Sequence, residues 1–196
     1  AVLYDQPFAY SKLFIIWYRL LFYIQGHFSK LVMTVSQFSK ERLIYYLPHI
    51  KNKILVINNG YEHVYTLNQD LSIIEKLNLK NKSFFLTVGS RNPNKNLQFV
   101  ENLSRKFPEQ TFVLVTNYNT NIFASNKLKN GNNLIYATDI SDEKLIALYS
   151  KADAVLCPSS YEGFGITLIE SLALETNVIA SDIPAHVEVG GNKPIY

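Results

Sequence analysis

The sequence has few of the residues that cross-link a chain or bind metals. Among its 196 residues it has one cysteine, one methionine and one tryptophan. A single cysteine excludes a disulfide within the chain and favours a reducing compartment. Because Cys157 ends an apolar segment with no histidine near it in the sequence, we expect it to be a small core residue rather than a nucleophile.

Charged residues are also scarce, at 18% of the chain, and the formal net charge is only +3. Such a mild excess does not predict a nucleic-acid partner. The sequence contains no Asp-x-Asp pair. The four histidines show no metal-ligand spacing: His27, His49, His63 and His186. Sites that hold a diphosphate through a divalent cation commonly use paired acids, so we predict no metal and no other cofactor.

No hydrophobic run is long enough to cross a bilayer, which takes about 20 residues. The longest run, LFIIWYRLLFYI at residues 13–24, has Arg19 inside it. Two interpretations stay open. The run can be a helix packed in a core or against a neighbouring domain, or an interfacial helix with Trp17 near lipid headgroups. The only flanking positive charges are Lys12 and Lys30, which favours the first interpretation.

Hydrophobic residues make up 47% of the chain, enough for a folded core. Short, nearly continuous apolar runs predict strands at residues 31–35, 54–57, 84–88, 111–115, 133–136, 154–157 and 178–180. Such runs are typical of parallel strands buried on both faces. Helical patterns occupy residues 37–47, 71–77, 96–106, 142–151 and 167–174. The alternation predicts an α/β fold with a doubly wound parallel sheet, in which ligands bind beyond the carboxyl ends of the strands.

Local signals mark the ends of several elements. Pro48 is expected to end the helix at residues 37–47, and Ser141 to cap the helix at 142–151. The turn signal Asn58-Asn-Gly60 suggests a boundary between an incomplete first domain, residues 1–58, and a second domain, residues 59–196, truncated at its end. The opening AVLYD is strand-like, and the last residues look like a further strand, so we expect a fragment of a longer protein whose sheet lacks a covering helix.

The segment EGFGITLIE, residues 162–170, is the most specific pattern for function. A strand, a Gly-x-Gly turn and a helix follow one another there. The first amides of such a helix and its dipole favour an anion. Glu162 and Glu170 flank the turn and can accept hydrogen bonds from hydroxyl groups. An anion site beside two hydroxyl-binding acids predicts a sugar nucleotide as ligand.

Three segments in order support this prediction: VGSRNPNKNL at 88–97, ATDISDEKLIALYSKADAVLCPS at 137–159, and YEGFGITLIESLALETNVIASDIPAHVEVGG at 161–191. Together they resemble the carboxyl-terminal domain of the family 4 retaining glycosyltransferases of GT-B fold. TVSQFSKERL at 34–43 and INNGY at 57–61 resemble the end of that family's amino-terminal domain and the crossing between its domains. The resemblance implies a Rossmann-like donor domain preceded by a partial amino-terminal domain.

The resemblance also implies roles for residues. Lys95 would bind the diphosphate, with Arg91 as a second cation in the same loop. Glu162 would bind hydroxyls of the donor sugar, and Glu170 those of the ribose. The catalytic set is therefore Glu162, Lys95 and Arg91. The donor-binding set is Lys95, Arg91, Gly163, Phe164, Gly165, Ile166, Thr167, Leu168 and Glu170. Ser36 and Glu188 match family positions as well, Ser36 as a helix cap and Glu188 as a cap or brace for its loop.

The implied activity is the transfer of a sugar, with retention, from a UDP- or GDP-sugar to a glycan or lipid-linked acceptor in polysaccharide assembly. The implied place is the cytoplasm, with peripheral contact at the inner membrane surface left open. Tyr4 stands where the family often has a histidine near the reacting sugar, which supports an alternative: a non-catalytic module that binds a sugar nucleotide or glycan. A structural partner chain with a vestigial site is a third interpretation. The isolated chain is expected to bind a sugar nucleotide at best weakly and to turn over nothing.

Overall fold

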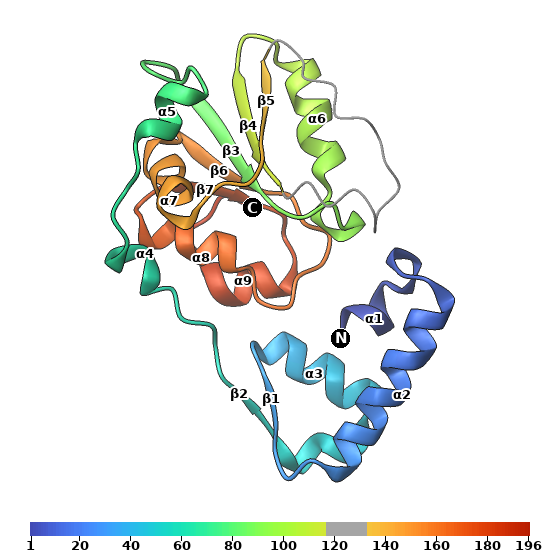
Figure 1. The fold of residues 1–196 in the computed structure, drawn as a ribbon. Coiled ribbons are helices and arrows are strands. Elements are labelled where there is room, and N and C mark those ends of the chain that lie inside the picture. The colour runs from blue at the N-terminus through green and yellow to red at the C-terminus, as the bar shows by residue number, and fades with distance from the viewer. Residues whose placement is uncertain (117–132) are drawn as a thin grey trace.

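The structure is a computed structural model that describes residues 1–116 and 133–196. Two parallel sheets organise these residues (Figure 1). The larger sheet has the strand order β5-β4-β3-β6-β7, and its strands are β3 (Phe84–Val88), β4 (Thr111–Val115), β5 (Leu134–Ala137), β6 (Ala154–Cys157) and β7 (Asn177–Ala180). The smaller sheet pairs β1 (Val32–Thr34) with β2 (Ile54–Val56). The parallel α/β fold predicted from the sequence is confirmed.

The first part of the chain, residues 1–58, is built mainly from helices around the two-stranded sheet. Its helical elements are α1 (Val2–Asp5), η1 (Pro7–Ala9), α2 (Lys12–Phe28), α3 (Gln37–Tyr46) and η2 (Pro48–Lys53). A small core of Leu47, Ile50 and Ile54 holds them together, and Phe22 of α2 packs against it. A Cβ at Gly26 would lie 2.7 Å from Nε2 of His49, so this glycine allows α2 to approach η2 closely.

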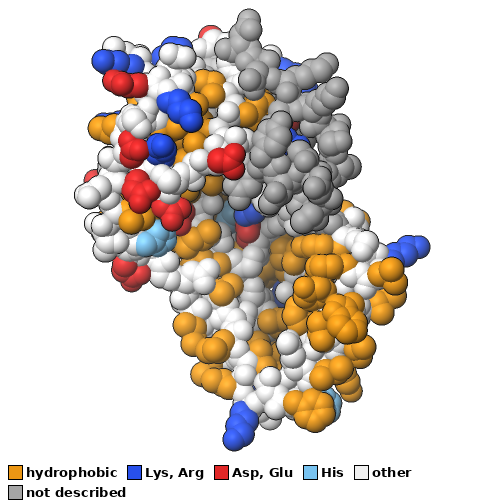
Figure 2. All heavy atoms as spheres, viewed as in Figure 1, with side chains coloured by type: hydrophobic (Ala, Val, Ile, Leu, Met, Phe, Trp, Pro, Cys, Tyr) orange, Lys and Arg blue, Asp and Glu red, His pale blue; other side chains and the backbone are white. Residues whose placement is uncertain are grey.

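One face of α2 carries large apolar side chains that remain exposed. They include Leu13, Ile16, Trp17, Leu20, Tyr23 and Ile24. Figure 2 shows hydrophobic side chains gathered over the part of the molecule where Figure 1 places α2. Of the two interpretations of this helix, packing in a core therefore holds only for the side that carries Phe22. Within the residues that the structure describes, no helix combines the length and hydrophobicity needed to cross a bilayer.

In the second part, residues 59–196, helices cover both faces of the larger sheet. The chain enters it through α4 (His63–Thr66) and α5 (Ser72–Lys76), and the later helical elements are η3 (Pro93–Lys95), α6 (Leu97–Lys106), α7 (Asp142–Lys151), α8 (Ile166–Ala173) and α9 (Pro184–Gly190). In Figure 1, α6 lies on one face of the sheet, and α5, α7 and α8 lie on the other. The strands β3, β4 and β6 are therefore largely buried, which fits their continuous apolar sequences, whereas β7 alternates exposed and buried residues.

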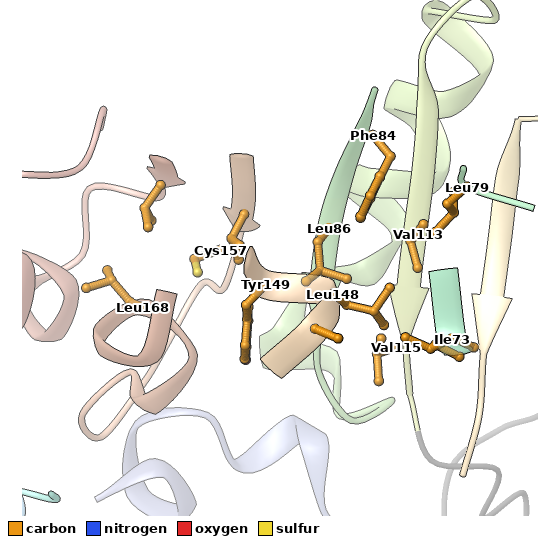
Figure 3. Close-up of a cluster of buried hydrophobic side chains, with 14 of the residues drawn as sticks. Ile73, Leu79, Phe84, Leu86, Val113, Val115, Leu148, Tyr149, Cys157 and Leu168 are labelled. Atoms are coloured by element: carbon orange, nitrogen blue, oxygen red, sulfur yellow. The ribbon is translucent and has the colours of Figure 1, made fainter. Parts of the chain in front are cut away.

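The main core lies between the sheet and the helices α5, α7 and α8 (Figure 3). Leu86 of β3, Leu148 of α7 and Leu168 of α8 are fully buried in it. Cys157 belongs to the same cluster, as predicted for a small core residue. Burial raises the pKa of its thiol to about 12, so the sulfur stays protonated at neutral pH and is a poor nucleophile.

On the opposite face, α6 covers β3, β4 and β5 and buries Val100 against Phe112 and Leu114. A hollow of about 700 Å³ remains between α6 and the strands β6 and β7. Its walls are largely apolar and include Phe85, Phe99, Phe107, Leu156 and Ile179.

One local prediction was wrong, and another was confirmed only in part. The opening AVLYD was expected to be strand-like but forms α1, in which the amides of Tyr4 and Asp5 donate to the carbonyl of Ala1. A short apolar run does not distinguish strand from helix, and no strand is paired with it. Ser141 occupies the N-cap position of α7, but its side chain makes no capping hydrogen bond. The last residues do add a parallel bridge, between Ile195 and Ile179 of β7.

Candidate functional site

Two loops leave the carboxyl ends of neighbouring strands and meet above the sheet. The first follows β3 and forms η3, which begins at Pro93; the side chain of Asn92 caps it by accepting from the amide of Asn94. Asn96 then adopts a left-handed backbone, with φ of 50°, and turns the chain into α6. The loops are joined because the amide of Ser160, in the second loop, donates to the carbonyl of Asn94 at 2.8 Å.

The second loop follows β6 and carries the Gly-x-Gly turn. Gly165 begins α8 with φ of 93°, a conformation that a side chain disfavours. A Cβ there would also lie 3.1 Å from Cδ2 of His186. No side chain caps the start of α8, so no capping side chain competes with a ligand for the first amides of this helix.

Lys95 and Glu162 face each other across the two loops. Nζ of Lys95 lies 2.6 Å from Oε1 of Glu162, and the hydroxyl of Ser159 donates to the same oxygen at 2.7 Å. Both charged side chains are mostly buried, with exposed fractions of 24% for Lys95 and 14% for Glu162. A cation and an acid predicted to serve one ligand are therefore brought into direct contact.

A small hollow lies at this contact. Its lining combines the Lys95–Glu162 pair with the start of α8 and the ends of β3 and β6: Thr87, Val88, Lys95, Cys157, Pro158, Ser159, Glu162, Gly165, Thr167, Leu168 and His186. A lysine and a helix amino end on one small hollow favour an anion electrostatically. Thr87 adds a buried hydroxyl that has no hydrogen-bond partner within the described residues.

His186 forms part of the wall beneath Gly165. It is 1% exposed, and burial lowers the pKa of its imidazole, so the ring is neutral at neutral pH. Nδ1 lies 3.1 Å from the carbonyl oxygen of Ser181, which can only accept, so Nδ1 carries the proton. The sequence-based view of His186 as a satisfied histidine fits this geometry, but its position in the wall of the hollow was not foreseen.

Glu170 lies one step beyond the hollow. It shares a face of α8 with Thr167, three residues earlier, which does line the hollow. Oε1 of Glu170 lies 2.9 Å from Nε2 of His63, and Oε2 accepts from the hydroxyl of Tyr149 at 3.0 Å. Burial and the nearby carboxylate raise the pKa of Tyr149, which keeps its hydroxyl protonated and able to donate. In this structure His63 therefore occupies the carboxylate that was predicted to hold a ribose.

The other predicted residues are placed as follows. Arg91 does not line the hollow with Lys95; it lines a neighbouring one, together with Glu101 and Tyr136. Phe164 and Leu168 are buried, so their contribution to a ligand is confined to the backbone. The residues on either side of Phe164 and Leu168 supply the turn and the first amides of α8: Gly163, Gly165, Ile166 and Thr167.

Tyr4, which stands where the family often has a histidine, is not among the residues that line the hollow. Its ring stacks on that of Tyr46, with 4.6 Å between centroids, and the guanidinium of Arg19 lies 4.9 Å from its centre. Among residues 1–116 and 133–196, no cluster of three or more His, Cys, Asp or Glu could hold a metal ion. Independence from metal stays a prediction.

The first part of the chain is fastened to the Gly-x-Gly turn. The hydroxyls of Ser36 and Ser39 both donate to the carbonyl of Gly163, at 2.5 and 2.9 Å. Ser36 also accepts from the amide of Ser39, which confirms it as the N-cap of α3. Glu188 of α9 accepts from the amides of Gln37 and Phe38 at 2.6 and 2.8 Å, so this carboxylate caps α3 from the other part of the chain.

Sequence reasoning missed the partners of the two acids. Ser159 lies three residues before Glu162, and its place between strand and turn was the available signal. His63 lies 107 residues from Glu170, and Tyr149 belongs to a different helix, so nothing local in the sequence announced these contacts. Long-range partners of this kind follow from the topology of the fold rather than from a motif.

Comparisons with known proteins agree with this geometry. Residues 69–193 match the family described as Glycosyl transferases group 1. The chain is 32% identical over 200 residues to the O-antigen chain mannosyltransferase RfbU of Salmonella typhimurium, covering 97% of this chain and 54% of that protein. It is 24% identical over 176 residues to O-antigen chain mannosyltransferase B of Escherichia coli, covering 84% and 46%. The chain thus spans about half the length of these relatives.

Among solved structures, the chain is similar to Anabaena HepE in complex with UDP and glucose, with a TM-score of 0.69. The sequence identity is 19%, and the match covers 93% of this chain and 52% of HepE. At that identity the likeness establishes the fold, which is the GT-B arrangement predicted from the sequence.

Proposed function

The chain belongs to the glycosyl transferases of group 1, and on this basis we propose that it is the donor-binding part of a retaining glycosyltransferase. It would serve the transfer of a sugar from a nucleoside-diphosphate sugar to a glycan or lipid-linked acceptor. The observation that carries the proposal is the Lys95–Glu162 contact of 2.6 Å in a hollow at the start of α8. This position, at the carboxyl ends of parallel strands, is where such sheets bind ligands.

The chemistry proposed for the site is electrostatic. Cleavage of the bond between the sugar and the diphosphate leaves negative charge on the diphosphate, and preorganised positive groups lower the barrier to it. Lys95 and the first amides of α8 would supply that charge, with Arg91 as a second cation if it turns from its neighbouring hollow. When Lys95 moves to the phosphates, Glu162 is released to accept hydrogen bonds from sugar hydroxyls.

Two features bear on the donor. RfbU and the Escherichia coli relative are mannosyltransferases by name, and the HepE structure holds UDP and glucose. GDP-mannose and UDP-glucose are therefore the donors to test first. Glu170 would hold the ribose of either nucleotide, and the ribose would have to displace His63 from its carboxylate. We propose that neither a metal nor another cofactor takes part.

The acceptor side rests on α2. Its exposed apolar face, with Trp17 and Tyr23, suits the headgroup region of a membrane. We therefore propose a cytoplasmic protein that contacts the inner membrane surface peripherally while it acts on a lipid-linked acceptor. Flotation of the chain with anionic vesicles tests this membrane contact. If the chain does not float with the vesicles, the proposed membrane contact is wrong.

The decisive experiment for the donor site is calorimetric titration of the chain with GDP-mannose, GDP, UDP-glucose and UDP. We expect one of the two pairs to bind. Because Lys95→Ala removes a charge-assisted contact to the diphosphate, affinity should fall at least about tenfold. Glu170→Ala should lower the affinity for the nucleotide and the affinity for the nucleotide sugar to a similar extent. Lys151→Ala, which removes an exposed lysine in the last turn of α7, is the matched control.

Absence of binding by every nucleotide would overturn the proposal, as would equal binding by the Lys95→Ala variant. Binding alone does not separate the enzyme from the alternative, a non-catalytic module that holds a sugar nucleotide. We expect the 196-residue chain to bind without turnover. Sugar transfer to an acceptor by a longer protein that contains this chain would decide for the enzyme.

A further inference from the structure

Asp5 is the centre of a polar cluster that joins the two parts of the chain. Its side chain is only 11% exposed, and Arg42 of α3 pairs with it through both Nε and a terminal nitrogen. The hydroxyls of Tyr46 and Tyr161 each donate to the carboxylate at 2.8 Å. Tyr46 belongs to α3, whereas Tyr161 belongs to the loop that carries Glu162. One carboxylate thus ties α1, α3 and the functional loop together.

The cluster is electrostatically complete. Burial by itself would raise the pKa of Asp5, but the hydrogen bonds from Arg42, Tyr161 and Tyr46 outweigh burial and hold that pKa below its ordinary value. Asp5 is therefore an anion at every physiological pH, and each of its donors has a fixed acceptor. A buried charge with this many partners resists rearrangement, because any donor that leaves exposes a desolvated charge.

Tyr161 connects this cluster to both charged residues of the hollow. It directly precedes Glu162 in the chain, and its carbonyl accepts from the side-chain amide of Asn94 at 2.9 Å. Asn94 in turn directly precedes Lys95. The ring of Phe38, in α3, packs against Tyr161 with 5.6 Å between centroids. Tyr161 therefore connects the backbone next to Lys95, through Asn94, with the backbone next to Glu162.

We propose that Asp5 is a positioning residue that acts through Tyr161 to hold Glu162 where a donor sugar is recognised. The inference rests on the proposed function of the hollow and adds a specific dependence: the first part of the chain fixes the sugar-binding acid, while the diphosphate contacts at α8 do not require it. A purely structural role for the cluster would change stability without separating the sugar from the nucleotide.

The test uses two variants that each remove one hydroxyl from Asp5. Tyr161→Phe and Tyr46→Phe both delete a phenol that lies 2.8 Å from the carboxylate, but only Tyr161 is in the loop of Glu162. For Tyr161→Phe we expect affinity for GDP-mannose or UDP-glucose to fall about tenfold, because small displacements of a positioning group are costly. Affinity for GDP or UDP should change by less than about threefold, because Tyr161→Phe keeps the backbone carbonyl that accepts from Asn94, next to Lys95. Tyr46→Phe should leave both affinities within that smaller range.

A second measurement makes the two proposals separable. Amide hydrogen exchange in residues 161–165 should speed up in Tyr161→Phe and stay unchanged in Tyr46→Phe, with or without a nucleotide. If the unmodified chain binds no nucleotide but the exchange differs in this way, the proposed function fails and the positioning of the loop stands. If both variants behave alike in exchange and in the ratio of sugar-nucleotide to nucleotide affinity, the positioning role of Asp5 is wrong.

Discussion

The two parts of the chain, before and after residue 58, differ in what holds them together. In the second part, fifteen buried residues form one core beneath a five-stranded sheet. The described first part has a core of three buried residues beside two strands. Its charge differs too: residues 1–58 have seven Lys or Arg and two Asp or Glu, a net of +5, whereas residues 59–196 have twelve and fourteen, a net of −2.

This difference indicates that the second part carries its own fold and that the first depends on it. The anchors of the first part are polar. Ser36 and Ser39 contact Gly163, and Asp5 contacts Tyr161, both in the functional loop. Glu188 of α9 caps the start of α3. These polar contacts therefore join the first part to the loop that carries Glu162 and to α9. The domain boundary at residues 58 and 59 stays a prediction.

The largest effects are expected when a side chain is truncated in each of the two cores, which tests whether the two parts differ in stability. Leu86→Ala, in β3, should cost about 2–5 kcal/mol and lower the urea midpoint of the whole chain. Ile50→Ala, a truncation of the same size, should instead speed up amide exchange in α3 while β3 and β4 keep their protection. Equal loss of protection in β3 from both variants would show that the two parts unfold as one unit.

A smaller effect is expected from the cap that crosses between the parts. Glu188→Gln replaces a carboxylate that accepts from the amides of Gln37 and Phe38. Because the group is exposed, the expected cost is about 1 kcal/mol, seen as faster exchange in the first turn of α3. Glu75→Gln, an exposed acid on α5, is the control. Unchanged exchange in α3 would show that the cap contributes nothing.

The smallest effect is a pH dependence that belongs to the second part. Burial lowers the pKa of His186, so below about pH 6.5 the unfolded chain binds a proton there that the native chain does not. The free energy of unfolding should therefore fall as the pH drops through about 6.5, by up to roughly 1 kcal/mol per pH unit. His186→Gln should flatten this dependence. His27→Gln, at an exposed position on α2, should leave it intact, and an equal flattening by both would contradict the assignment.

Much of the second part could be predicted from the sequence. The strands β3, β4 and β6 lie where continuous apolar runs placed them, because burial on both faces leaves an unambiguous pattern. The first part was less readable: the opening residues form α1 through bonds to Ala1 that no periodicity announces. Short elements stabilised by neighbours rather than by their own pattern are the ones that sequence reasoning misplaces.

The site divides in the same way. Lys95, Glu162 and Gly165 carry a motif, and the structure brings them to one hollow. Partners supplied by distant segments were invisible, such as His63 beside Glu170. Arg91 shows the limit of loop membership as evidence: it shares a loop with Lys95, yet it lines a neighbouring hollow.

Gly165 is constrained twice, and the two constraints can be separated genetically. Its backbone angle disfavours any side chain, and a Cβ would lie in tight contact with His186, 3.1 Å from Cδ2. In Gly165→Ala a smaller residue at position 186 would relieve the tight contact, but the torsional cost of about 1–2 kcal/mol would remain. A second-site change at His186 can therefore rescue such a variant only in part. Whichever residue stands at position 186, the glycine therefore has no unstrained replacement.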